Sequence, residues 1–450
     1  MNDQSKQPQP SDLVLGGNNP SPTDGLVLGG IEGVKKRLAS DDVKVRIAAL
    51  SDAIKYGDEG LDLVIKALED ESDRVRINAY LILRSRKEPR VKDAILNFNP
   101  YRFFECIYDV KIPDRTGGFI IFNQTKLLYC VSDFEFVSGE NVIRYVEWNL
   151  SQSQITKLPE LELLSEQYFI SNVPDRIASL YIHPETNTLI VTGTPKDNFC
   201  CNQIEIIDLS TGISRKEVDT LYDDSKIDYV SKKQIIRTLY GHSNFGTVRV
   251  NTAISKDRKI LATSSQTMIE PNQKDNSIIL WDLKTGKKLH ILKGNTKKVT
   301  SLAIDNDSSI LATASEDGTI QEWDIKTGEN IVCTKSDYNI VTNSSLPNNN
   351  GLIQLKASDP SDFFSVNSDG SILACAKYEP YPQYINEIKI FNTKTERHLA
   401  TLNHEKICGI AISPDGNTIV TKGVDIITTR SGNLTLHNTI PNLKLWQVKL

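Results

Sequence analysis

The segment Ile310-Leu-Ala-Thr-Ala-Ser-Glu-Asp-Gly-Thr-Ile-Gln-Glu-Trp-Asp324 contains two short apolar runs on either side of the turn Glu316-Asp-Gly318. β-Branched and aromatic residues are typical of strands, and Asp-Gly is typical of tight hairpin turns. A further run of the same kind, Val299-Thr-Ser-Leu-Ala-Ile304, precedes it. The segment therefore predicts antiparallel strands joined by short turns.

The same unit can be counted six times along the chain. The second strands of the units begin at Leu127, Leu189, Ile260, Ile310, Ile372 and Ile419. The third strands end at Trp148, Ile207, Trp281, Trp323, Phe391 and Trp446. One such sheet cannot bury both of its faces, so neighbouring sheets must stack and close into a ring without free edges.

These repeats predict an all-β propeller over residues 99–450, with six countable blades. A seventh blade could lie only near 215–240 or 335–360, and neither stretch has room for a complete blade. Because the chain ends on a third strand, Leu443–Leu450, the last blade needs a fourth strand from elsewhere. The apolar stretch Phe103–Ile112 is the expected source.

Two of the units resemble the WD-repeat family. Blade three carries Gly241-His242, Asp275 and Trp281-Asp282, and blade four carries Gly294-Asn295, Asp317-Gly318 and Trp323-Asp324. In that family a His, an Asp, a second-strand Ser or Thr, and the Trp form a buried hydrogen-bond relay. The resemblance implies these relay residues: His242, Ser264 or Thr263, Asp275 and Trp281 in blade three, and Asp317 and Trp323 in blade four.

The relay pattern is incomplete outside blade three. Blade four has Asn295 where the His is expected, and blade six has His404 and Trp446 but Ile440 where the Asp is expected. Blades one, two and five have lost most of the pattern. Because an unpaired buried donor costs about 1–3 kcal/mol, apolar packing must hold these degenerate blades.

Residues 31–98 have helical periodicity that repeats every 30 residues, as in Val45-Arg-Ile47 and Val75-Arg-Ile77. This duplicated helix pair resembles the HEAT-like repeat family, with its Val-Arg signature in the second helix. Arg46 and Arg76 could bind carboxylates of a partner, but pairing with acidic residues of the neighbouring repeat is the expected role. Residues 1–30 form a Pro- and Gly-rich arm that we expect to be flexible, with Leu-Val-Leu-Gly-Gly at 13–17 and again at 26–30.

Composition excludes several classes of protein. The 450 residues carry a net charge of −5, which disfavours a basic nucleic-acid binder. No apolar run is long enough to span a bilayer, and the first ten residues lack the apolar core of a signal peptide. The seven scattered Cys match no disulfide framework or zinc spacing. We therefore expect a cytoplasmic protein without membrane insertion.

No catalytic or cofactor motif stands out. A phosphate-binding Gly-Lys-Ser/Thr loop, a nucleophile elbow and a dinucleotide fingerprint are all absent from the sequence. His404-Glu-Lys-Ile-Cys408 resembles a metal-binding helix by only two residues. The predicted innermost strands, such as Val250–Ile254, contain no Asp, Glu or His that could converge on a central channel. We therefore expect no catalytic residue, no metal and no cofactor.

Most units are lengthened between their second and third strands, at 132–141, 195–202, 266–276, 378–386 and 423–441. Equivalent connections of a radial array lie on one face, which we call the loop face. Aromatic side chains on exposed loops are typical interface anchors. The predicted partner-binding residues are Phe134, Phe136, Phe199, Met268, Tyr378, Tyr381 and Tyr384.

These features favour a non-catalytic scaffold that binds one or more partner proteins through the loop face and the helical repeats. The alternative to a binding role is a structural one, in which the long loops fold back and bury their aromatic residues against one another. A second alternative is a small-molecule hydrolase on a propeller, resembling a lactonase. A third comes from the HEAT-like half, whose bacterial relatives include lyases and chaperones for bilin-carrying proteins.

Overall fold

A computed structural model provides the structure. It describes residues 30–86, 88–111, 119–123, 126–137, 140–150, 161–171, 177–183, 186–193, 201–218, 221, 224–243, 250–265, 276–335, 340–343, 352–355, 363–376, 387–431 and 434–448. The arm predicted at 1–30 lies outside these residues except for Gly30. The chain divides into two compact units, Met1–Glu105 with Gln447–Leu450, and Cys106–Trp446. The predicted boundary between residues 98 and 99 stays a prediction.

Helices make up the first unit. They are α1 (Gly30–Leu38), α2 (Val43–Ala53), α3 (Gly57–Lys66), α4 (Asp73–Leu83) and α5 (Pro89–Phe98), with 3-10 turns at Ile54–Tyr56, Ala67–Glu69 and Pro100–Phe103. The Asp42 side chain caps α2 by accepting from the Lys44 backbone N–H at 2.8 Å. The second helices of the two repeats, α2 and α4, pack against each other, as expected for stacked HEAT-like pairs.

Arg46 has the structural role expected from its position in the repeat. Its side chain is 5% exposed, and its guanidinium lies 3.1 Å from the Asp70 carboxylate and 3.2 Å from that of Glu71. It also donates to the Ser40 carbonyl at 2.7 Å. Since Asp70 and Glu71 belong to the second repeat, Arg46 joins the two helix pairs and is not available to a partner's carboxylates.

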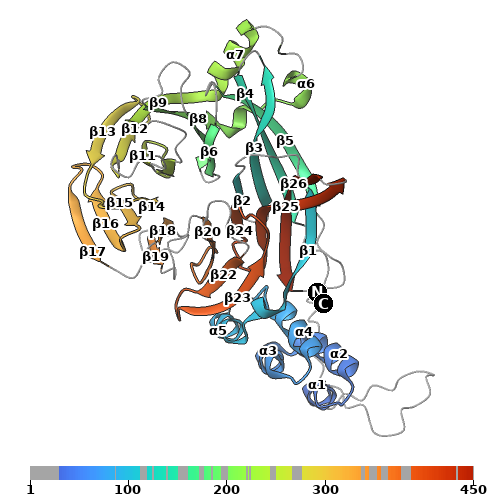
Figure 1. Cartoon of the computed structure of the whole chain (residues 1–450). Helices are drawn as coiled ribbons and strands as arrows, with labels where there is room; N and C mark the ends of the chain where they lie inside the picture. Colours follow the sequence, from blue (N-terminus) through green and yellow to red (C-terminus); the bar gives the residue numbers. More distant parts are fainter. Residues whose placement is uncertain are drawn as a thin grey trace, which may run out of the picture. The chain divides into compact units, whose positions relative to one another are not determined.

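The second unit is a six-bladed β-propeller, with each blade a four-stranded antiparallel sheet (Figure 1). Blade 1 is β2 (Phe119–Asn123), β3 (Lys126–Val137), β4 (Glu140–Leu150) and β5 (Leu161–Ser171). Blade 2 is β6 (Ile177–His183), β7 (Thr188–Gly193), β8 (Cys201–Asp208) and β9 (Ile235–Ser243). Blade 3 is β10 (Val250–Ile254), β11 (Ile260–Ser265), β12 (Ile278–Asp282) and β13 (Lys287–Leu292).

The remaining blades follow the same order from the innermost strand outward. Blade 4 is β14 (Val299–Ile304), β15 (Ile310–Ser315), β16 (Thr319–Asp324) and β17 (Asn330–Lys335). Blade 5 is β20 (Phe363–Val366), β21 (Ile372–Ala376), β22 (Glu387–Asn392) and β23 (Arg397–Asn403). Blade 6 is β24 (Gly409–Ile412), β25 (Ile419–Ser431), β26 (Leu434–Val448) and β1 (Phe104–Lys111).

The outer strand of blade 6 comes from the other end of the repeat array. The sheet has the order β1-β26-β25-β24, so β1 is hydrogen-bonded to the last strand of the chain (Figure 1). The sequence predicted this strand at Phe103–Ile112. In addition, β2 of blade 1 lies against β24 of blade 6, so the first and last blades are neighbours in the ring.

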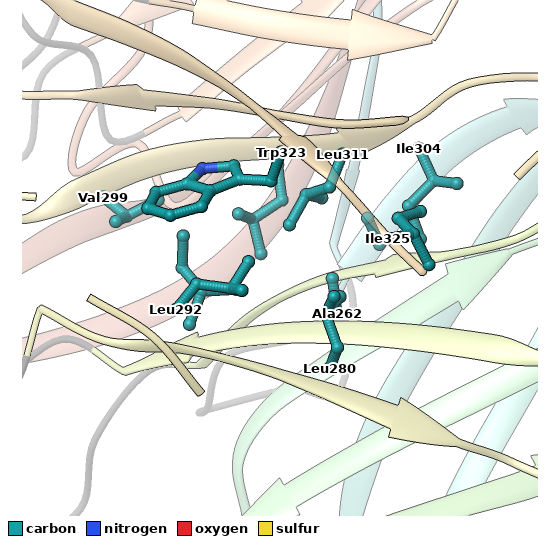
Figure 2. Packing of buried hydrophobic residues seen from close by; sticks show 11 residues of the cluster. Ala262, Leu280, Leu292, Val299, Ile304, Leu311, Trp323 and Ile325 are labelled. Atoms are coloured by element: carbon teal, nitrogen blue, oxygen red, sulfur yellow. The ribbon is translucent and has the colours of Figure 1, made fainter. Parts of the chain in front are cut away.

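Apolar side chains fill the spaces between neighbouring blades. Between blades 3 and 4 the cluster includes Ala262, Leu280 and Leu292 from one sheet and Val299, Leu311 and Trp323 from the other (Figure 2). An equivalent cluster joins blade 1, through Leu127 and Val146, to Ala411, Val420, Leu443 and Leu445 of blade 6. Because these clusters lie between sheets, each blade depends on its neighbours for its core.

Two further elements depart from regular repetition. The strands β18 (Ile340–Asn343) and β19 (Leu352–Leu355) form a two-stranded sheet within residues 335–360. From its length, this stretch was expected to have no room for a complete blade. Helices α6 (Arg215–Val218) and α7 (Asp224–Gln234), which the sequence did not predict, lie between β8 and β9. The Gln234 side chain anchors α7 on blade 1, because it accepts from the Ile170 N–H at 2.9 Å and donates to the Tyr168 carbonyl at 3.2 Å.

Candidate functional site

The polar core of blade 3 joins three side chains. His242, at the end of β9, lies with its Nε2 2.8 Å from the Thr263 hydroxyl on β11. The Trp281 indole N–H on β12 donates to the same hydroxyl at 2.9 Å. Thr263 therefore connects His242 to Trp281. Of the two second-strand residues that the sequence offered, Ser264 is the wrong choice, because its hydroxyl has no hydrogen-bond partner among the described residues. Asp275 lies outside the described residues.

Blade 4 keeps only part of this arrangement. The Trp323 indole N–H donates to the Thr313 hydroxyl at 3.3 Å, as Trp281 does to Thr263. Asn295, which occupies the position of the His, is 8% exposed and its side chain has no hydrogen-bond partner among the described residues. The substitution of Asn for His thus leaves this relay without its first member.

Asp317 does not join Trp323, contrary to the relay expected from the sequence. Its carboxylate accepts from the Thr319 backbone N–H at 2.9 Å and from the Thr296 hydroxyl. Burial opposes ionisation, but the hydrogen bonds from Thr296 and Thr319 outweigh it and lower the pKa of Asp317. Asp317 therefore stabilises the turn between β15 and β16 as an anion.

Blade 6 has a longer network than the sequence predicted. The His404 ring lies 2.6 Å from the Thr421 hydroxyl through Nδ1 and 2.8 Å from the Asn442 side-chain oxygen through Nε2. The Trp446 indole N–H donates to Thr421 at 2.9 Å. The Asn442 amide in turn donates to Asp109 of β1 at 2.7 Å. The network thus extends from the blade core to the strand that closes the ring.

Asn442 and Asp109 were not among the predicted relay residues. The position expected to be acidic, six residues before Trp446, is occupied by Ile440. Asn442 lies only four positions before Trp446, and the carboxylate comes from Asp109, which is 333 residues away along the chain. An Asn flanked by apolar residues in the last strand is the one signal that could have indicated a buried polar partner.

The predicted loop face lies mostly outside the described residues. This applies to Phe199, Met268, Tyr378, Tyr381 and Tyr384. Phe134 and Phe136 are on the strand β3, which extends to Val137 and is followed by β4 from Glu140.

Two of the lengthened connections are corrected by the structure. Residues 132–137 lie in the strand β3, paired with β4 from Glu140, and residues 423–431 of β25 pair with 434–442 of β26, so these described residues form strands and not loops. Their β-branched residues, such as Ile426 and Thr428, favour this continued pairing.

One comparison with known proteins, that with family models, agrees with this geometry. The family model "WD domain, G-beta repeat" matches residues 233–282 and 286–324. These two segments are WD40 repeats. Together they contain the relay of blade 3 and the partial relay of blade 4. No curated protein matches the sequence significantly. Among solved structures, a chain of a structure described as "Crystal Structure of Mitotic Checkpoint Complex" matches with 14% identity and a TM-score of 0.36, over 76% of this chain and 91% of that one.

Each WD40 repeat requires a glycine beside its tryptophan. A Cβ added to Gly241 would lie 2.7 Å from the Trp281 ring, closer than side-chain atoms tolerate, whereas one added to Gly294 would lie 3.1 Å from the Trp323 ring. We expect Gly241→Ala to lower the free energy of unfolding by about 1–3 kcal/mol because the indole must move. Gly294→Ala should lower the free energy of unfolding by a smaller amount. Urea unfolding of both variants measures the difference, and an equal loss would contradict this account of the contact.

A histidine does lie on an innermost strand, which corrects the expectation that these strands contain no Asp, Glu or His. β6 extends through His183, whose Nε2 is 3.3 Å from the Thr252 hydroxyl of β10. Burial lowers the pKa of His183 to about 4, so the imidazole is neutral at pH 7. No group of three or more His, Cys, Asp or Glu side chains in the described part of the chain is arranged to hold a metal ion.

The lowered pKa of His183 predicts a pH dependence of stability. Because the unfolded chain binds a proton at this His below about pH 6.5 and the folded chain does not, stability is lost as the pH falls from 6.5 toward 4. His183 is half-buried, so solvent screens part of the effect, and between pH 7 and 5 we expect a loss of roughly 1–2 kcal/mol in the free energy of unfolding from this residue. Urea unfolding of wild type and His183→Gln at both pH values measures the contribution of His183 to this loss. An identical pH dependence of stability in the two proteins would contradict a lowered pKa of His183.

Proposed function

We propose that this chain is a non-catalytic scaffold that binds partner proteins through the loop face of its propeller and through its helical repeats. The observation that carries the proposal is the combination of WD40 repeats with a closed six-bladed propeller. A propeller offers an extended rigid surface, and its hydrogen-bonded blade cores fix the positions of the connections between strands. Fold alone does not set function, so this step rests on the family as well.

The net charge supports a protein, and not a nucleic acid, as the partner. The exposed thiols support a location in the cytoplasm. A net charge of −5 provides no long-range attraction for nucleic acid. Among the described residues, Cys106 and Cys333 are exposed free cysteines. Exposed free thiols fit a reducing compartment, where disulfides are rare. We also infer the domain division 1–30, 31–98 and 99–450, with the arm as a separate segment.

The loop face is tested by tyrosine substitution and affinity capture. We expect Tyr381→Ser with Tyr384→Ser to reduce the amount of captured partner at least about fivefold, because exposed aromatic anchors contribute a large share of binding energy. The melting temperature should not change. Tyr229→Ser is a matched control, since Tyr229 is 71% exposed on α7 and belongs to no predicted loop-face segment. Quantitative mass spectrometry of the captured proteins measures the effect; unchanged capture by the double variant would remove the loop-face proposal.

A further inference from the structure

The outermost strands of blades 2, 3 and 4 carry exposed apolar side chains. Of the large hydrophobic residues that are exposed in the described part of the chain, all but Tyr229 lie on these three strands. They are Ile236 and Tyr240 on β9, Leu289 and Ile291 on β13, and Ile331 and Val332 on β17. We call these six residues and their strands the rim sector. Figure 1 shows the three strands at the outer edge of successive blades.

Side-chain hydrogen bonds hold the three strands of the rim sector in a fixed order. Arg237 of β9 donates to the carbonyl of Lys284 at 2.6 Å, in the turn that leads into β13. His290 of β13 lies 3.0 Å from the carbonyl of Lys326, in the turn that leads into β17. β9 is thus tied to blade 3 and β13 to blade 4, so hydrogen bonds connect the three strands of the rim sector.

The centre of the rim sector is basic. From Leu283 to Ile304 the sequence contains six lysines and no Asp or Glu, in a chain whose net charge is −5. Lys284, Lys287, Lys288 and Lys293 are exposed at and beside β13. Such a surface attracts a negatively charged partner and repels a second copy of itself.

β13 is also an open strand edge. It is the last strand of the sheet β10-β11-β12-β13, and no strand of the described residues pairs with its outer side. Leu289 is 40% exposed and Ile291 is 52% exposed, so nothing in the described residues covers these side chains. An open edge offers backbone N–H and C=O groups to an added strand, and neighbouring apolar side chains give that strand its specificity.

We propose that the rim sector binds an extended segment of a partner protein, rich in acidic and apolar residues, by strand addition to β13. The charge of the surface selects the acidic residues, Leu289 and Ile291 select the apolar ones, and the open edge favours a polypeptide over a nucleic acid or a lipid headgroup. The flanking lysines oppose edge-to-edge pairing of two copies of this chain. The inference rests on the proposed scaffold function but uses a surface other than the loop face.

The test uses the full chain and a fluorescein-labelled ten-residue peptide that alternates Glu with Val. Fluorescence anisotropy should show saturable binding that weakens as salt increases, and the corresponding Lys–Val peptide should not bind. Lys287→Glu with Lys293→Glu should raise the Kd at least tenfold, and Leu289→Ser with Ile291→Ser should have a similar effect. Lys394→Glu with Arg397→Glu makes the same change of charge on the outer strand β23 of blade 5 and the turn before it, where Arg397 is the equivalent of Lys287, and should leave the Kd unchanged.

Hydrogen–deuterium exchange identifies the mode of binding. At saturating Glu–Val peptide, amides of β13 should exchange more slowly, whereas those of β23 should not change. Binding that leaves β13 exchange unaltered would overturn strand addition. Equal displacement of the peptide by oligouridylate, or by vesicles containing phosphatidylserine, would show a general polyanion surface and would also overturn the proposal. If the peptide fails to bind while the loop-face variants still capture less partner, strand addition to β13 is rejected and the proposed scaffold function is retained.

Discussion

Replacing Trp281 with alanine is expected to lower the free energy of unfolding of the propeller by about 3–5 kcal/mol, because it is a large-to-small change in a packed core. Trp281 is 2% exposed, packs between blades 2 and 3, and donates to Thr263. The substitution removes the apolar contacts of the ring and one partner of the Thr263 hydroxyl together. Urea unfolding followed by the circular dichroism of the strands measures the loss.

A second variant separates packing from hydrogen bonding. Trp281→Phe keeps an aromatic ring but lacks the indole N–H, so it should cost only about 1–2 kcal/mol. A loss below about 1 kcal/mol for Trp281→Ala would show that the ring does not support the blade. Equal losses for the two variants would show that the hydrogen bond, and not the packing, is decisive.

Asn442→Ala is expected to lower the free energy of unfolding by about 3 kcal/mol. The side chain is fully buried and joins His404 to Asp109, so its removal takes a hydrogen-bond partner from both groups. A buried polar group that loses its partner costs about 1–3 kcal/mol. Asn417→Ala is the control, because the Asn417 side chain donates to nearby Asp415 in a turn and does not join two distant strands through His404 and Asp109. A similar small loss for both variants would contradict a structural role for the network.

The fold was predictable because it depends on local patterns. Hairpin turns, Ile-Leu-Ala-Thr strands and Trp-Asp pairs recur along the sequence, and each depends on residues close together in the chain. The closing strand at Phe104–Lys111 was predictable for a different reason, since the last blade lacked an outer strand. The helices α6 and α7 were missed because their polar sequence has little amphipathic signal, and tertiary contacts such as those of Gln234 hold them.

The site was less predictable because its contacts are distant in sequence. Thr263 and Ser264 are adjacent, and only the direction of each side chain in the strand decides which one meets Trp281. The pair Asn442 and Asp109 meets through ring closure, which no local pattern encodes. The exposed apolar edge of β13 could not be predicted either, because the alternation of apolar and polar residues does not show which strand is outermost in a blade.

Hydrogen–deuterium exchange on the intact chain tests ring closure by β1 most directly. If β1 pairs with β26 and Asn442 bonds to Asp109, amides of Phe104–Lys111 should exchange at least about 100-fold more slowly than in an unstructured peptide. In Asn442→Ala, exchange in β1 should be faster, whereas exchange in β11 of blade 3 should change little. Exchange of the β1 amides at unprotected rates in the wild-type chain would contradict a closed propeller.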